Sequence, residues 1–317
     1  MSLPLRKKFR SWSRPSALLA LAAFLAAAPI PEAWGCACGC GVYDTQTNSM
    51  LPTQPGGMLY LEYDFMNQKQ NWAGTSSASD DDNSDKQIRS NFVNAGIHYM
   101  FNRQWGVMAN VPVDQRYFKT MADDGGIQGY SHTALGDISL QGVYTGFSPD
   151  MSSGLTFGLK LPTGDDTYAN FDRDTELGTG STQILLGAYH TGAITSDDKW
   201  MYFADGEWDE PTLIAAGYRP GAEVDAVAGG YYNNWRAGSL KIAPMAQAVG
   251  SLRWRDSGPA AHSGDTGYQR ILLWPGLELD SPSWKVDAGV GFPIYQRANG
   301  NQLVADEYYR LIVGWSF

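Results

Sequence analysis

The sequence predicts an all-β protein, a closed antiparallel up-and-down barrel of about twelve strands that spans a membrane. Three observations support this fold class. Segments of about ten residues within 58–317 carry apolar side chains at every second position. The connections between these segments alternate between long and short, and aromatic residues gather near the segment ends. Outer-membrane barrels combine these features, with long extracellular loops, short periplasmic turns and aromatic girdles.

The first 35 residues have the parts of a secretory signal. Residues 6–14 hold five basic side chains, residues 16–28 form a short apolar core, and residues 33–35 resemble a cleavage site. The apolar core is shorter than the roughly 20 residues that a spanning helix needs. Without this segment, lysine plus arginine falls from 23 to 18 and aspartate plus glutamate from 33 to 32, so the formal net charge changes from −10 to −14. Such an acidic chain is a poor partner for nucleic acid.

Alternating apolar residues define the first five strands, and these residues are expected to face lipid. The expected strands are 58–66, 88–101, 104–113, 134–147 and 153–162. In order, their apolar faces are Leu59, Leu61, Tyr63 and Phe65; Val93, Ala95, Ile97 and Tyr99; Trp105, Val107, Ala109 and Val111; Ile138, Leu140 and Tyr144; and Leu155, Phe157, Leu159 and Leu161.

Seven further strands are expected at 181–191, 199–208, 222–232, 238–252, 267–279, 284–295 and 306–317. The phase of 181–191 is ambiguous, and 199–208 has a tryptophan near each end. The remaining five have these apolar faces: Val224, Ala226 and Ala228; Leu240, Ile242 and Ala246; Ile271, Leu273 and Leu277; Val286, Ala288, Val290, Phe292 and Ile294; and Tyr309, Leu311, Val313, Trp315 and Phe317.

The connections provide an independent check on the strand count. Six long connections are expected near 67–87, 114–133, 163–180, 209–221, 253–266 and 296–305, and five short ones at 102–103, 148–152, 192–198, 233–237 and 280–283. This alternation requires an even number of strands and places both ends of the barrel on the periplasmic side. A soluble β-sandwich or propeller also alternates, but no fixed-period repeat is present.

Polar side chains opposite the apolar faces are expected to line the lumen. Arg310 on the last strand and Glu62 on the first become neighbours when the barrel closes. The lining is either a polar path for a small solute or an ion-paired core that plugs a narrow barrel, because twelve strands enclose less space than the 16–18 of porins. The expected lining residues are Glu62, Asp64, Asn91, Asp137, Gln141, Lys160, Asp225, Lys241, Gln247, Arg270, Glu278, Lys285, Asp287 and Arg310.

The three cysteines, Cys36, Cys38 and Cys40, follow the signal in a segment, residues 36–57, that precedes the barrel. This segment is expected to lie in the periplasm or to fold back as a plug of the lumen. Three thiols at alternate positions could hold a soft metal ion such as Cu(I) or Zn(II). Their spacing does not match the usual zinc or haem motifs. Lipidation of Cys36, a disulfide or a plain anchoring segment are the alternatives.

No catalytic centre is expected. The four histidines lie on different segments, and neither Gly-x-Ser-x-Gly nor His-Glu-x-x-His occurs. The acidic runs at 80–85 and 165–176 could attract divalent cations, but solvated loop surface is the better interpretation. No cofactor is required.

Two motifs carry a family resemblance. The final strand ends in Phe317 after alternating apolar residues, which resembles the insertion signal read by the barrel-assembly machinery. Leu-Gly-Asp at 135–137, Leu-Pro-Thr-Gly-Asp at 161–165 and Leu-Gly-Thr-Gly-Ser at 177–181 resemble the family named "MetA-pathway of phenol degradation". This resemblance implies an outer-membrane transporter linked to aromatic catabolism. Loop shaping is the simpler role for Pro162, Thr163, Gly164, Gly178 and Gly180.

The sequence therefore predicts an outer-membrane channel or facilitator for a small solute, aromatic or apolar in one interpretation. Its expected partners are outer-membrane lipid, the assembly machinery and the solute itself. The alternative is a metal-binding or electron-handling outer-membrane protein in which the barrel carries the cysteine segment.

Overall fold

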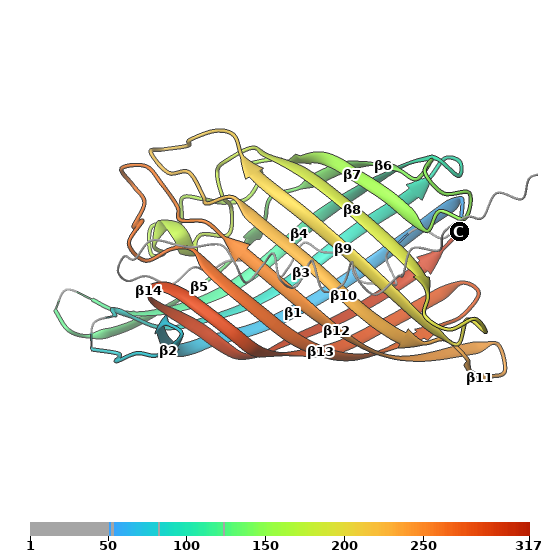
Figure 1. Cartoon of the computed structure of the whole chain (residues 1–317). Helices are drawn as coiled ribbons and strands as arrows, with labels where there is room; N and C mark the ends of the chain where they lie inside the picture. The colour runs from blue at the N-terminus through green and yellow to red at the C-terminus, as the bar shows by residue number, and fades with distance from the viewer. Residues whose placement is uncertain (1–50, 52–53, 82, 123) are drawn as a thin grey trace, which may run out of the picture. The chain divides into compact units, whose positions relative to one another are not determined.

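The computed structural model describes residue 51 and residues 54–81, 83–122 and 124–317, in which one antiparallel sheet closes on itself (Figure 1). No helix in these ranges is long and apolar enough to cross a membrane. The elements are β1 (Gly56–Gly74), β2 (Ser76–Ser77), β3 (Asp85–Met100), β4 (Trp105–Met121), β5 (Ile127–Leu135), β6 (Ser139–Tyr144), β7 (Ser153–Lys160), the 3₁₀ helix η2 (Arg173–Thr175), β8 (Gln183–Ala193), β9 (Trp200–Pro211), β10 (Glu223–Tyr232), β11 (Trp235–Ala237), β12 (Leu240–Arg253), β13 (Tyr268–Asp280) and β14 (Trp284–Ser316).

Eleven strands pair in a closed ring, in which β10 pairs with β12 and the first strand, β1, pairs with the last, β14. One of these strands, β14, crosses the wall twice. It pairs with β13 along residues 285–298 and with β1 along 298–316, and it reverses near Gly300, whose φ of 72° suits glycine. The wall therefore has twelve crossings, and the predicted fold class is confirmed.

The chain end joins the start of the first strand. The Phe317 amide donates to the Gly57 carbonyl and the Gly57 amide donates to the Phe317 carbonyl, both at 2.9 Å. The Phe317 ring stacks on Tyr99 at a centroid distance of 6.3 Å. The last residue thus takes part in closing the barrel, while its recognition by the assembly machinery stays a prediction.

The outer face carries the alternating apolar residues that the sequence predicts. Leu61, Leu140, Leu273 and Leu311 are 47%, 50%, 46% and 42% exposed, far more than leucine in a soluble core. Exposed aromatic rings include Trp105, Phe147, Trp200, Trp208 and Trp315. A continuous apolar exterior with aromatic residues near the strand ends is what a lipid-facing barrel requires.

The two ends of the barrel differ in their connections. At one end, here called the turn end, the chain reverses within short segments such as 101–104, 194–199 and 281–283. At the other, the loop end, three longer segments connect strands: 161–182, 212–222 and 254–267. Figure 1 shows the short reversals on the right and the long segments on the left.

The predicted loops at 67–87, 114–133 and 296–305 are largely wrong. Strands continue through them: β4 and β5 pair from Val113–Leu135 to Met121–Ile127, and β14 reverses tightly. Apolar alternation marks only the part of a strand that contacts lipid. Beyond that band both faces meet water, so the pattern disappears although the hydrogen bonds continue.

The predicted fourth strand, 134–147, is interrupted. The wall at this position consists of β5 and β6, separated by Gly136, Asp137 and Ile138, and both strands pair with β4. The next strand, β7, pairs with β6 but ends at Lys160, opposite Ser139. The chain then leaves the wall through the 161–182 loop.

Candidate functional site: a charged lumen

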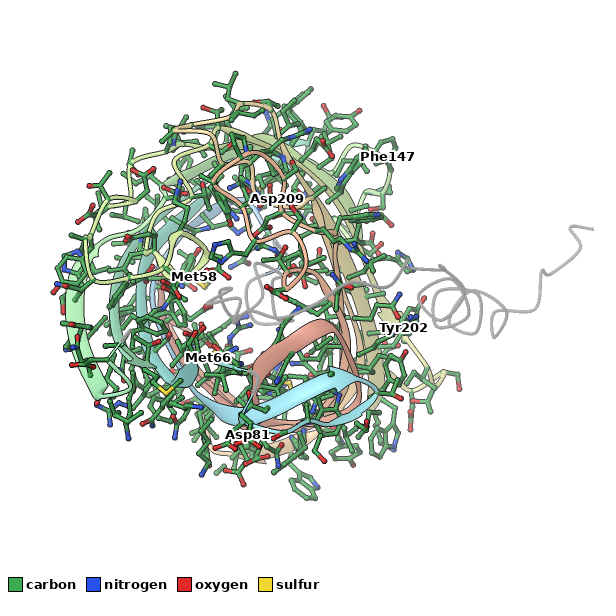
Figure 2. All side chains as sticks on the ribbon, turned by 90° about the vertical axis from the view of Figure 1, so that its left-hand side faces the viewer. Met58, Met66, Asp81, Phe147, Tyr202 and Asp209 are labelled. Carbon is green, nitrogen blue, oxygen red and sulfur yellow. The ribbon has the colours of Figure 1, made fainter. Side chains whose placement is uncertain are left out.

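The interior face encloses a cavity of about 220 Å³ in the half of the barrel nearer the loop end. Strands β1, β3, β4, β6 to β10 and β12 and the 161–182 and 212–222 loops contribute to its lining. Viewed along the barrel in Figure 2, Asp209 lies on the inner side of the wall and Tyr202 on the outer side. Nine carboxylates and four basic side chains line the cavity: Glu62, Asp114, Asp137, Asp174, Glu176, Glu207, Asp209, Glu223 and Asp225, with Arg116, Lys160, Arg173 and Arg253.

Asp137 ties the interrupted wall to the 161–182 loop. Its Oδ1 accepts from the Gly164 amide at 2.9 Å, and its Oδ2 accepts from the Thr179 amide at 2.9 Å and the Thr179 hydroxyl at 2.5 Å. Thr163 adds two bonds: its Oγ1 accepts from the Ile138 amide and donates to the Gly136 carbonyl. Residues of the 135–137, 161–165 and 177–181 segments therefore hold a loop in place.

Two motif glycines are needed for close backbone contact. A Cβ added to Gly178 would lie 2.4 Å from the Gly164 carbonyl carbon, and one added to Gly164 would lie 2.6 Å from the Gly178 Cα. Gly180 has φ 65°, in the left-handed region. The loop-shaping interpretation of Gly164, Gly178 and Gly180 is thus supported by specific contacts.

Buried Arg116 on β4 holds the same loop from inside the barrel. Its Nη1 donates to the carbonyls of Thr175 at 2.5 Å and Glu176 at 2.9 Å. Arg173 Nη2 contacts Asp166 at 2.9 Å, and its guanidinium lies 4.3 Å from the Tyr218 ring centroid. The 161–182 loop is therefore bound on the inner face, where it forms part of the cavity lining.

Burial raises the pKa of Glu176, in this loop, to about 7. Asp165 and Asp166 raise this pKa further, while a backbone hydrogen bond from Tyr168 and the charge of Arg173 lower it. The carboxyl of Glu176 thus titrates close to neutral pH at the edge of the lumen.

Hydrogen bonds and ion pairs connect the strands that line the cavity. Gln141 Nε2 donates to Glu207 Oε2 at 2.8 Å, and Lys160 Nζ lies 2.7 Å from Asp209 Oδ2. Arg253 contacts Glu223 at 3.5 Å. The lining combines paired charges with an excess of carboxylates.

A second ionic network lies where the first and last strands meet. Arg310 Nε lies 2.8 Å from Asp64 Oδ1, and Arg310 Nη2 lies 3.5 Å from Glu62 Oε1. The expected pairing of Arg310 with Glu62 is therefore present. On β12 and β13, Lys241 Nζ lies 3.3 Å from Glu278 and 3.2 Å from Asp280.

An apolar cluster covers much of the inner face toward the turn end. Its members are buried, and many lie within the last residues of β3, β8 and β10 or the first residues of β4, β9 and β12. The sequence pattern does not predict this cluster, because only polar residues are expected on the inner face. The inner cluster includes Met66, Phe92, Met100, Met108, Val143, Met151, Tyr189, Phe203, Tyr231, Met245, Trp274 and Tyr308.

Most of the predicted lining residues lie on the inner face, but Asn91 does not. Asn91 shares the outer face of β3 with Val93, and its Oδ1 accepts a hydrogen bond from the exposed Tyr63 hydroxyl at 2.8 Å. Arg270 points inward, where its Nη1 donates to Tyr308 at 2.6 Å, and Lys285 alternates in phase with buried Asp287. Asp64, Gln141, Asp225, Gln247 and Glu278 are buried on the inner face.

The cysteine segment lies outside the described residues, so Cys36, Cys38 and Cys40 are not placed. Within the described ranges, no group of three or more histidine, cysteine, aspartate or glutamate side chains is arranged to hold a metal ion. Leu51, which precedes β1, is buried in the inner apolar cluster.

Comparisons with known proteins concern the fold. No family model matches the chain, and no curated protein matches it. Its structure is similar to the crystal structure of an outer-membrane channel from Pseudomonas putida F1, with a TM-score of 0.63, 14% sequence identity, and coverage of 86% of this chain and 99% of that one.

Two further solved barrels are more distant. The β-domain of the Bordetella autotransporter BrkA gives a TM-score of 0.49, with 12% identity over 83% of this chain and 100% of that one. The Pseudomonas putida toluene transporter TodX gives 0.41, with 11% identity over 90% and 98%. Taken with the apolar exterior described above, the similarity to the Pseudomonas putida F1 channel shows that this chain has the fold of an outer-membrane β-barrel.

Proposed function

We propose that this protein is a channel of the bacterial outer membrane that admits a small solute carrying an aromatic or apolar group. The observation that carries the proposal is the interior: a charged cavity of about 220 Å³ that opens onto the apolar inner cluster within a lipid-facing wall. A cavity of this size suits a compound of about one ring rather than a protein or an oligosaccharide.

The shared fold with a solved outer-membrane channel supports transport over catalysis. The motif residues around Asp137 resemble the "MetA-pathway of phenol degradation" family, which favours an aromatic solute. Because these residues hold a loop in place, the motif supports the architecture more directly than it supports a named substrate.

Uptake into proteoliposomes tests the proposal. Vesicles containing the folded protein should take up small ring-containing solutes faster than protein-free vesicles, and large solutes at the protein-free rate. Folding is verified by heat-modifiable migration on a denaturing gel. Equal uptake of every solute with and without folded protein would contradict a channel function.

A further inference from the structure

We propose that the lumen selects organic cations, namely small protonated amines with an aromatic or apolar body. This inference rests on the proposed channel function and adds the charge of the solute to it. The surfaces that would recognise such a compound are the carboxylate-rich cavity and the apolar inner cluster next to it.

The charge balance of the cavity favours cations. Nine carboxylates face four basic groups, a formal excess of five negative charges. The surrounding barrel wall and lipid have a low dielectric constant, so the field of these carboxylates is concentrated in the lumen. Rings of aspartate and glutamate give cation preference in other pores for the same reason. An anion entering this cavity meets nine carboxylates and only four basic groups.

Gln141 provides an independent indication that the cavity accepts a hydrogen-bond donor. Its side chain is only 8% exposed and lines the cavity. Its Nε2 donates to Glu207 Oε2. This contact fixes the orientation of the amide, because in the flipped orientation the Gln141 amide oxygen would lie against the Glu207 carboxylate oxygen. Gln141 Oε1 has no hydrogen-bond partner among the described residues. A buried acceptor of this kind costs free energy unless a donor reaches it, and an ammonium group carries up to three.

The apolar inner cluster adds a second requirement. Phe92 and Met108 belong both to the cavity lining and to the cluster, so the two surfaces are continuous. Aromatic and methionine side chains attract an apolar body, and aromatic faces also attract an ammonium group. Apolar constrictions resist small hydrated ions. An amine with an attached ring can interact favourably with both the carboxylates and the apolar cluster, whereas potassium can interact favourably only with the carboxylates.

The wall formed by β1, β12, β13 and β14 carries nearly balanced charges instead. Asp64, Glu278 and Asp287 face inward there together with Arg310, Lys241 and Arg270. The excess of carboxylates therefore belongs to the cavity.

Reversal potentials in planar bilayers test the proposal. Gradients of benzylammonium chloride, potassium chloride and sodium benzenesulfonate at pH 7 give the permeability of a ring-bearing cation, an inorganic cation and a ring-bearing anion. Protein-free bilayers correct for leak of uncharged amine. We expect benzylammonium to be about tenfold more permeant than benzenesulfonate, and more permeant than potassium.

Variants connect the selectivity to the cavity. Glu207→Gln and Gln141→Leu should each lower the ratio of benzylammonium to benzenesulfonate permeability several-fold. Asp81→Asn, a change of one exposed loop-end carboxylate outside the cavity, should leave the ratio unchanged. Each variant is first shown to migrate as a folded barrel.

The outcomes separate the two proposals. A ratio near or below one in the wild type, or equal ratios in wild type, Glu207→Gln and Gln141→Leu, would overturn cation selection while leaving the channel in place. A ratio that falls equally in Asp81→Asn would assign the effect to surface charge and would also overturn it. No protein-dependent current with any salt, together with no uptake of neutral solutes by vesicles, would overturn the channel function itself.

Discussion

At the scale of single residues, Asp137 shows how a recognisable motif can serve structure rather than recognition of a substrate. One carboxylate accepts three hydrogen bonds from two separate parts of the 161–182 loop. The sequence predicts turn formation by Gly164 and Gly178, but it does not reveal that Asp137 joins the two. That connection depends on residues 27 and 42 positions apart along the chain.

Replacing Asp137 with alanine should release this loop without opening the barrel. The change removes all three hydrogen bonds and leaves two backbone amides without their acceptor, at a cost of about 1–3 kcal/mol for each amide that stays buried. We expect faster proteolysis within 161–182 and unchanged heat-modifiable migration. Asp81→Ala serves as the matched control. Equal proteolysis of wild type and Asp137→Ala would contradict the anchoring role.

Glu176 is expected to make the charge of the lumen depend on pH. Because burial raises its pKa to about 7, its carboxyl is mostly neutral at pH 6 and mostly ionised at pH 8. A raised pKa means that the docked loop is favoured at low pH. It loses this stabilisation as the pH rises from the usual pKa of a glutamate through 7. The negative charge of the cavity grows over the same range.

The selectivity for benzylammonium over benzenesulfonate should therefore increase between pH 6 and pH 8. Glu176→Gln should reduce this increase, because its amide stays neutral. Asp165, Asp166 and Arg173 are kept unchanged, since their charges act on the same carboxyl. Reversal potentials measured across this pH range provide the readout, and identical pH profiles for both proteins would exclude Glu176 as the titrating group.

At the scale of elements, apolar alternation predicts the lipid-facing part of each strand well and the remainder poorly. The expected outward residues of β1, β3 and β4 are exposed, as for Leu61, Val93 and Val107. The polarity of Asn91 predicts an inner-face position, but its phase with Val93 places it on the outer face. Near the loop end an outward side chain leaves the lipid, so polarity no longer distinguishes the two faces.

A charged residue on the lipid face should separate a membrane barrel from a soluble one. Leu273 lies in the middle of β13 and is 46% exposed. Arginine there should destabilise the barrel by about 2–4 kcal/mol in a bilayer. Leu213→Arg, the same change in the exposed 212–222 loop, should have little effect. Chemical unfolding from liposomes measures both, and equal stability of the two variants would contradict a lipid-facing position for Leu273.

At the scale of the whole molecule, the sequence predicts a closed barrel but not the division of its interior. Alternation assigns an inner face without saying what fills it. Met100, Met108 and Met245 gather with aromatic residues only because separate strands bring them to the same end. The charged cavity likewise depends on the 161–182 loop folding inward. Arg116 holds the loop there through hydrogen bonds to two backbone carbonyls, and no sequence pattern predicts these bonds.

The orientation of the molecule in the membrane follows from its two unlike ends. Long loops of outer-membrane barrels face outward and short turns face the periplasm, so the acidic half of the lumen would meet solutes first. Ser77 lies in β2 beside the loop-end extension of β1, and Asn102 lies in a turn-end reversal; both are exposed. Each can therefore report on one side of the membrane.

Cysteine labelling in intact cells tests this orientation. Cys36, Cys38 and Cys40 are first replaced with serine, and Ser77→Cys or Asn102→Cys is then added. A membrane-impermeant maleimide should label residue 77 in intact cells, and residue 102 only after the outer membrane is opened. The two positions act as controls for each other, because both are exposed on the same barrel. Preferential labelling of residue 102 in intact cells would reverse the orientation and place the apolar half of the lumen at the cell surface.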